Sequence, residues 1–248
     1  AWAQEGDERA IAYEERDADR AVDADDDPLV IEARRQVIEH CLYGVDLNPM
    51  AVEMAKLSLW LVSMDPQRPF TFLDDRLVAG DSLLGIGNVT NLSEGAARDL
   101  RLERDLAKVL ELRRRLAELP DRLDTLPEKR RLLDEARAVR QRADAYADLL
   151  TGASLASVKR GQDEVVIAER VATLTKHLAS SDDPTSLVAQ ARSWLALDKP
   201  AGAFDRKPLH WPLEFPEVFE RGGFDAIIGN PPFLGGKKIR GPLGSAYR

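Results

Sequence analysis

The chain has 248 residues and a mass of 27.5 kDa, with 44% hydrophobic, 31% charged and 6% aromatic residues. This composition is typical of a folded α/β or helical protein and excludes a disordered or collagen-like chain. The net charge of −8 arises within residues 1–40, which hold thirteen acidic residues against five arginines. No polybasic footprint is present, so any contact with nucleic acid must come from a local patch or from additional sequence.

The lengths of the apolar runs and the number of cysteines indicate the cellular compartment in which the protein is expected. Apolar runs such as residues 57–64 end long before the roughly 20 residues that a bilayer requires. Cys41 is the single cysteine in the sequence, so it forms no internal disulfide and supplies no zinc site. We therefore expect a cytoplasmic protein with no membrane segment and no metal ligands.

Residues 1–27 form an acidic, polar N-terminal segment, and its aspartate run reads as a solvated loop. Asp27 followed by Pro28 is typical of a helix start, with a capping side chain and a proline in the first turn. Apolar residues on one side of the following segment predict a helix that reaches His40.

Two short strands follow, each ending in a carboxylate. Residues 42–46 form an apolar run that ends in Asp46, and Asn48-Pro49 begins a helix to about residue 64. Residues 77–81 predict a second strand that ends in Asp81. We assign residues 28–90 to the first part of an α/β core.

The composition then changes to that of a helical insertion over residues 91–203, with helices expected near 94–119, 128–150, 162–180 and 184–197. The first two have narrow apolar seams, which predict an antiparallel coiled-coil hairpin. The seam positions are Leu102, Leu106, Val109, Leu112, Leu116, Leu119, Leu132, Ala136, Val139, Ala143, Tyr146 and Leu150. The balanced charge of the hairpin indicates solvated outer faces, and the insertion is a possible site for a protein partner.

The second part of the core covers residues 204–248. Prolines in residues 207–216 predict an extended segment packed by its aromatic side chains, and we interpret His210 as structural. Residues 224–229 predict a third strand, which leads directly into Asn230-Pro231-Pro232-Phe233. The fold class is thus α/β, with a partial Rossmann-like sheet interrupted by the helical insertion.

Strands that end in Asp46, Asp81 and Asn230 place polar side chains where open α/β sheets bind ligands. Asp46 suits the two hydroxyl groups of a ribose, although a helix cap or turn explains it equally well. Asp81 suits an adenine amino group, although Gly-Asp also marks ordinary turns.

The Asn230-Pro231-Pro232-Phe233 sequence is the strongest signal. Two prolines remove backbone donors, which leaves carbonyl oxygens and the Asn230 amide oxygen as acceptors for an aromatic amine. Such acceptors favour a tetrahedral nitrogen that attacks an electrophile, and Phe233 offers a face for a stacked base. The alternative is a tight polyproline turn.

These blocks resemble the N6-adenine type of amino-group DNA methyltransferase found in large restriction-modification and phage-defence methylases. The resemblance rests on Tyr43-Gly-Val-Asp-Leu-Asn-Pro, Gly80-Asp-Ser-Leu, His210-Trp-Pro-Leu-Glu-Phe-Pro and Phe224-Asp-Ala-Ile-Ile-Gly-Asn-Pro-Pro-Phe. It covers residues 28–87 and 205–248 and implies a class I methyltransferase sheet with S-adenosylmethionine as donor.

The resemblance also implies roles for single residues. Asp46 would bind the ribose hydroxyls and Leu47 the adenine ring of the donor, with Asp81 and Ser82 near its amino edge. Asn230 and the Pro231 carbonyl would hold the target amine of an adenine flipped out of double-stranded DNA, with Phe233 stacked on the base.

The chain departs from this family because no glycine-rich loop and first strand precede Asp46. Since that strand lies between the second and fourth strands of the family's sheet, we expect an internal fragment that is inactive alone.

Two alternatives stay open, a protein glutamine N5-methyltransferase and a non-catalytic helical scaffold. Lys237, Lys238 and Arg240 suit DNA phosphates or an exposed basic loop equally well. The oligomeric state is not predictable.

Overall fold

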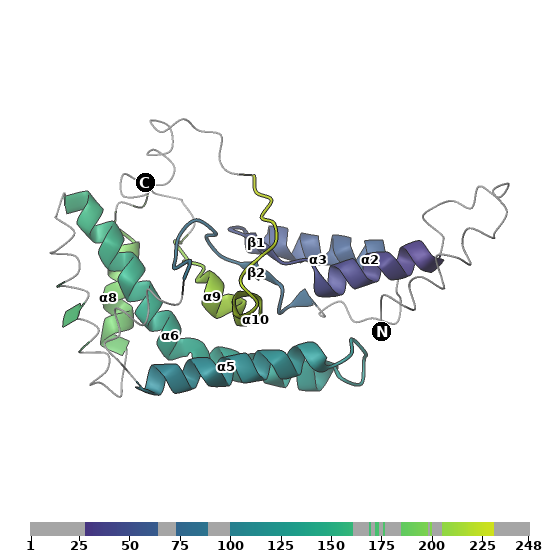
Figure 1. Cartoon of the computed structure of the whole chain (residues 1–248). Coiled ribbons are helices and arrows are strands. Elements are labelled where there is room, and N and C mark those ends of the chain that lie inside the picture. Colours follow the sequence, from purple (N-terminus) through teal and green to yellow (C-terminus); the bar gives the residue numbers. More distant parts are fainter. Residues whose placement is uncertain are drawn as a thin grey trace. The chain divides into compact units, whose positions relative to one another are not determined.

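A computed structural model describes residues 28–63, 73–88, 100–160, 169, 172–173, 176, 185–197, 199 and 205–230 (Figure 1). These residues divide into two compact units. The first contains residues 28–42 and 58–63, and the second contains residues 43–57 and the remaining described residues. Among the described helices, none combines the length and the apolar character needed to cross a bilayer.

In the first unit, helix α2 (Pro28–His40) has the bounds that the sequence predicts. Its Ile38 side chain is buried, and Arg35 Nε donates a hydrogen bond to the Ser63 carbonyl oxygen at 3.2 Å. Proline fits the start of α2 because the first turn of a helix has no intrahelical acceptor for its missing N–H group.

The second unit contains the two strands, β1 (Gly44–Asp46) and β2 (Leu77–Ala79), each shorter than predicted. They pair in parallel with Gly44 opposite Leu77 and Asp46 opposite Ala79. Parallel neighbours require a crossover, and the chain between them contains helix α3 (Pro49–Ser63). An isolated parallel bridge joins Asp81 to Pro208, so the chain after the insertion returns beside the end of β2.

The structure corrects the prediction of a third strand at residues 224–229, which lie outside both strands and the bridge. The Ile227 and Ile228 side chains are 75% and 97% exposed. A strand forms only where a neighbour satisfies its backbone groups, and within the described part of the chain β1 pairs with β2 alone. The apolar sequence of this segment is therefore not sufficient to make it a strand.

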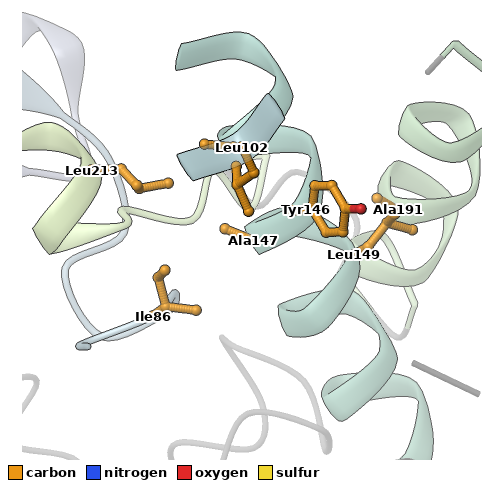
Figure 2. Close-up of a cluster of buried hydrophobic side chains, with 8 residues drawn as sticks. Ile86, Leu102, Tyr146, Ala147, Leu149, Ala191 and Leu213 are labelled. Carbon is orange, nitrogen blue, oxygen red and sulfur yellow. The ribbon is translucent and has the colours of Figure 1, made fainter. Parts of the chain in front are cut away.

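Helices α5 (Leu100–Glu118) and α6 (Leu126–Arg160) form the predicted hairpin, side by side in Figure 1. All twelve seam positions belong to its two apolar clusters, either as buried members or packed against them. One cluster lies near the turn, around Leu112 and Leu132. The other extends to residues outside the hairpin, and Figure 2 shows Ile86 and Leu213 facing Leu102 and Ala147. The hairpin seam thus continues into the core that contains the loop after β2.

Helix α6 continues ten residues beyond the predicted end at residue 150. Glycine weakens a helix, but a Cβ atom at Gly152 would lie 3.2 Å from both the Ala191 carbonyl oxygen and the Trp194 Cβ atom. The missing side chain therefore lets helix α8 (Thr185–Leu195) pack closely on α6. Of the helix expected at 162–180, residues 169, 172, 173 and 176 are helical and the others lie outside the described residues.

The expected extended segment at residues 207–216 is wrong from Trp211 onward, where two short helices form, α9 (Trp211–Glu214) and α10 (Pro216–Glu220). Their prolines occupy the first turns, where a proline costs no hydrogen bond. The predicted aromatic packing is confirmed. Phe224 lies at the centre of a cluster, with ring centroids 5.4–6.1 Å from those of Tyr43, Trp211, Phe215 and Phe219.

Candidate functional site

Asp46 ends β1 with an exposed side chain that takes part in the following turn. Its Oδ1 atom accepts a hydrogen bond from the Asn48 backbone N–H at 2.7 Å, and Asn48 Oδ1 accepts one from Met50 N–H at 3.0 Å. Asn48 therefore caps α3, and Asp46 holds the chain between strand and helix. The turn uses one of about four acceptor positions on a carboxylate. Asp46 can still bind a further donor from its exposed side.

Asp81 and Ser82 lie in the loop that follows β2. The Asp81 side chain is 8% exposed, and its Oδ1 atom accepts a hydrogen bond from Leu83 N–H at 3.1 Å. Ser82 is exposed, and its carbonyl oxygen accepts a hydrogen bond from Trp211 Nε1 at 3.0 Å. Asp81 thus shapes the loop from inside, while Ser82 lies on its surface.

The strand register brings four of the expected site residues to one edge of the sheet. Asp46 is opposite Ala79, and the Gly80 N–H group donates to the Asp46 carbonyl oxygen at 2.9 Å. Because the strands are parallel, the chain leaves both at this edge, with Leu47 after β1 and Asp81-Ser82 after β2.

Asn230, the first residue of the expected target pocket, is exposed at the end of the segment that begins at Phe224. The three residues that follow it, Pro231, Pro232 and Phe233, lie outside the described residues, as do Lys237, Lys238 and Arg240. The predicted acceptor pocket at Asn230 and the stacking role of Phe233 therefore stay predictions.

Sequence reasoning missed a buried ion pair that joins the hairpin to α10. Arg113 donates from Nε and Nη2 to the two carboxylate oxygens of Glu217 at 3.0 and 2.6 Å, and Nη2 also reaches the Asp75 carbonyl oxygen at 3.0 Å. Burial disfavours the charge on Arg113, but the hydrogen bonds and charge of Glu217 outweigh it and raise the pKa of the guanidinium. Nothing in the spacing predicts this pair, because its members are 104 residues apart.

A second pair connects α6 with α9. Arg140 Nη2 lies 2.7 Å from Glu214 Oε2, and its Nε donates to Asp144 Oδ2 at 3.0 Å. Burial raises the pKa of Asp144, and the charge of Arg140 opposes the rise. The expectation of solvated outer faces on the hairpin is therefore wrong on the side that meets α9 and α10.

A cavity of about 1130 Å³ lies among β2, α3, α6 and α8. Its lining does not include Asp46, Leu47, Asp81 or Ser82. Polar and charged groups in its wall pair with one another, at 2.7 Å for Lys56–Asp74, 2.7 Å for Arg140–Glu214 and 3.0 Å for His210–Asp148. We therefore regard this cavity as a polar contact region between the insertion and the sheet.

The comparisons with known proteins agree with the resemblance noted from the motifs. A family model described as Eco57I restriction-modification methylase matches residues 40–247, which is more than half of the chain. The match includes both strands, the hairpin and the segment that ends at Asn230. No curated protein and no solved structure matches the chain.

Proposed function

Because the chain belongs to the Eco57I restriction-modification methylase family, we propose that it transfers a methyl group from S-adenosylmethionine to the N6 amino group of adenine in double-stranded DNA. The biological role would be restriction-modification or phage defence. We further propose that β1 and β2 belong to a Rossmann-like sheet into which the helical residues are inserted.

The donor assignment is supported chiefly by the parallel register that opposes Asp46 to Ala79. This register carries Leu47, Asp81 and Ser82 to the same edge as Asp46. Carboxylates accept paired hydrogen bonds from a ribose diol, and the exposed Asp46 side chain has acceptor positions beyond the one that its turn uses. The exposed Asp46 carboxylate at this edge therefore supports an adenosine group as the ligand. S-adenosylmethionine, when bound, supplies an electrophilic methyl group on a positively charged sulfur.

The target end of the proposal depends on Asn230, which is exposed at the end of its segment. Its amide oxygen and the Pro231 carbonyl would accept the two N6 hydrogens of a flipped adenine. This would keep the nitrogen lone pair directed at the methyl group. One nitrogen–carbon bond forms as the carbon–sulfur bond breaks, and the amine then gives a proton to solvent.

The proposal is tested with the full-length protein in two measurements. Isothermal calorimetry measures the affinity for S-adenosylmethionine, and a radiolabelled donor measures methyl transfer to duplex DNA that is then digested to nucleosides. Asp46→Ala should weaken donor binding about tenfold, as expected for a lost pair of charge-assisted hydrogen bonds. Asn230→Ala should leave donor affinity unchanged and lower kcat by about 100-fold or more.

Asp134→Asn is the matched control, since this α6 carboxylate is 76% exposed and lies far along the chain from both segments. Labelled N6-methyladenosine is the expected product. Labelled glutamine in peptides without labelled DNA would replace the proposal with the protein methyltransferase. A full-length protein that binds no donor would leave the scaffold interpretation.

A further inference from the structure

We propose that His210 and Trp211 are positioning residues for the donor loop, defined here as residues 80–86, and that Asp148 of the helical insertion orients His210. This inference deepens the proposed function and rests on it, because the loop carries Asp81 and Ser82. It assigns a role to the His210-Trp211 pair beyond filling the core, and it connects the insertion to donor binding.

The segment 207–211 makes a continuous set of hydrogen bonds with the donor loop. Asp81 N–H donates to the Lys207 carbonyl oxygen at 2.7 Å, and Leu209 N–H donates to the Leu84 carbonyl oxygen at 2.8 Å. The side chains of the next two residues complete the set. His210 Nδ1 accepts from Ile86 N–H at 3.3 Å, and Trp211 Nε1 donates to the Ser82 carbonyl oxygen at 3.0 Å.

Gly85 shows how closely the two segments approach. Its φ angle is +136°, and a Cβ atom at this position would lie 2.2 Å from the Leu209 carbonyl oxygen. Glycine is the residue that tolerates both this backbone conformation and this contact. The loop conformation is therefore set against segment 207–211 rather than by the loop sequence alone.

The two nitrogen atoms of His210 have different partners, which fixes the tautomer of the ring. Nδ1 accepts from Ile86 N–H, so it carries no proton, and Nε2 is the protonated nitrogen that faces Asp148 Oδ1 at 3.0 Å. His210 is 6% exposed, so these contacts hold the ring in place. Asp148 belongs to α6, and the geometry of the donor loop thus depends on a residue of the insertion.

Trp211 connects the same loop to the target side. Its indole ring lies 5.6 Å from the Phe224 ring, nearly perpendicular to it, while its N–H group is bonded to Ser82. Phe224 begins the segment that ends at Asn230. One side chain therefore contacts both the loop proposed to bind the donor and the segment proposed to bind the target.

The test separates the two nitrogen atoms of His210 with amide substitutions in the full-length protein. In His210→Asn the amide oxygen replaces Nδ1 as acceptor for Ile86, whereas in His210→Gln the amide N–H replaces Nε2 and the acceptor for Ile86 is lost. Hydrogen exchange of the Ile86 amide should be about tenfold faster in His210→Gln, the size expected for one lost buried hydrogen bond. It should change less than about threefold in His210→Asn.

Donor affinity gives the functional readout, measured by calorimetry with S-adenosylmethionine. We expect about fivefold to tenfold weaker binding in His210→Gln and in Trp211→Phe, with His210→Asn near the wild type. Asp148→Ala should raise exchange at Ile86 in the same direction, while Asp134→Ala on the exposed face of α6 should not.

Equal exchange in the two His210 variants would mean that the ring only fills space, and it would overturn the positioning role. Faster exchange without weaker donor binding would overturn it as well. A wild-type protein that binds no donor would refute the proposed function and this inference with it. If the wild type binds the donor and His210→Gln binds it with equal affinity, this inference alone is refuted.

Discussion

Two neighbouring arginines of α5 make ion pairs with α10 that differ in burial, and their replacement gives the sharpest test of the packing. Arg113 pairs with Glu217, and these side chains are 4% and 11% exposed, whereas Arg114 pairs with Glu220 at 55% and 37%. Arg113→Met leaves a buried carboxylate without its partner, which should lower the free energy of unfolding by about 3–5 kcal/mol. Arg114→Met should lower it by no more than about 1 kcal/mol, because water screens that pair.

Urea unfolding of the full-length protein measures both effects, with tryptophan fluorescence reporting on Trp211 beside α10. A double replacement, Arg113→Met with Glu217→Leu, removes both charges and should restore most of the lost stability. The bond from Arg113 to the Asp75 carbonyl oxygen is lost in both variants and should leave a deficit of about 1 kcal/mol. Equal losses for Arg113→Met and Arg114→Met would refute the assignment of a buried pair.

Three further predictions use the same unfolding assay. Gly85→Ala should cost about 2 kcal/mol or more, because of its positive φ angle and the 2.2 Å approach of a backbone oxygen, whereas Gly87→Ala, with open space around it, should cost about 0.5 kcal/mol or less. Leu112→Ala at a fully buried seam position should cost about 2–5 kcal/mol, while Leu123→Ala at 64% exposure should stay within about 0.5 kcal/mol. Burial raises the pKa of Asp75 above 3.8, so its contribution to stability is present below pH 3.8 and is lost as the pH rises through the folded value. Asp75→Asn should therefore be more stable than the wild type at neutral pH, with a difference that shrinks toward pH 3.8.

Elements with local signals were predictable from the sequence. Pro28 and Asn48 mark helix starts because a capping side chain or a proline acts within one turn of the chain. The hairpin seam was predictable at every position. Its apolar residues recur every three or four positions, a spacing that follows from the geometry of one helix packed against a second helix. These signals need no knowledge of distant contacts.

Elements that depend on distant partners were not predictable in the same way. The helix expected to end near residue 150 continues through Gly152, whose missing side chain lets α8 pack closely. Residues 224–229 have the apolar composition of a buried strand without a described neighbour to pair with. The prolines after His210 favoured an extended chain, yet each falls in a first turn where it is compatible with a helix.

The same limit applies to the site. The position of Asp46, Leu47, Asp81 and Ser82 at one edge of the sheet was predictable, because they end or follow parallel strands, whereas their roles in binding stay predictions. The groups that shape the loop were not, since His210 lies 124 residues from Ile86 and 62 from Asp148. A single sequence shows that a histidine can form hydrogen bonds, but it does not identify the backbone group that the histidine contacts.

The segment from Lys207 to Glu220 connects the helical insertion to the candidate site. Backbone and side-chain hydrogen bonds tie its first part to the donor loop, and one isolated bridge, Asp81 to Pro208, is its sheet contact among the described residues. Its second part is held by ion pairs to α5 and α6. The loop after β2 and the chain that leads to Asn230 are therefore joined directly by segment 207–211, and ion pairs to the insertion hold the later part of that chain. The hairpin therefore supports the candidate site from two sides, through segment 207–220 and through the bond from Arg113 to the Asp75 carbonyl oxygen just before β2.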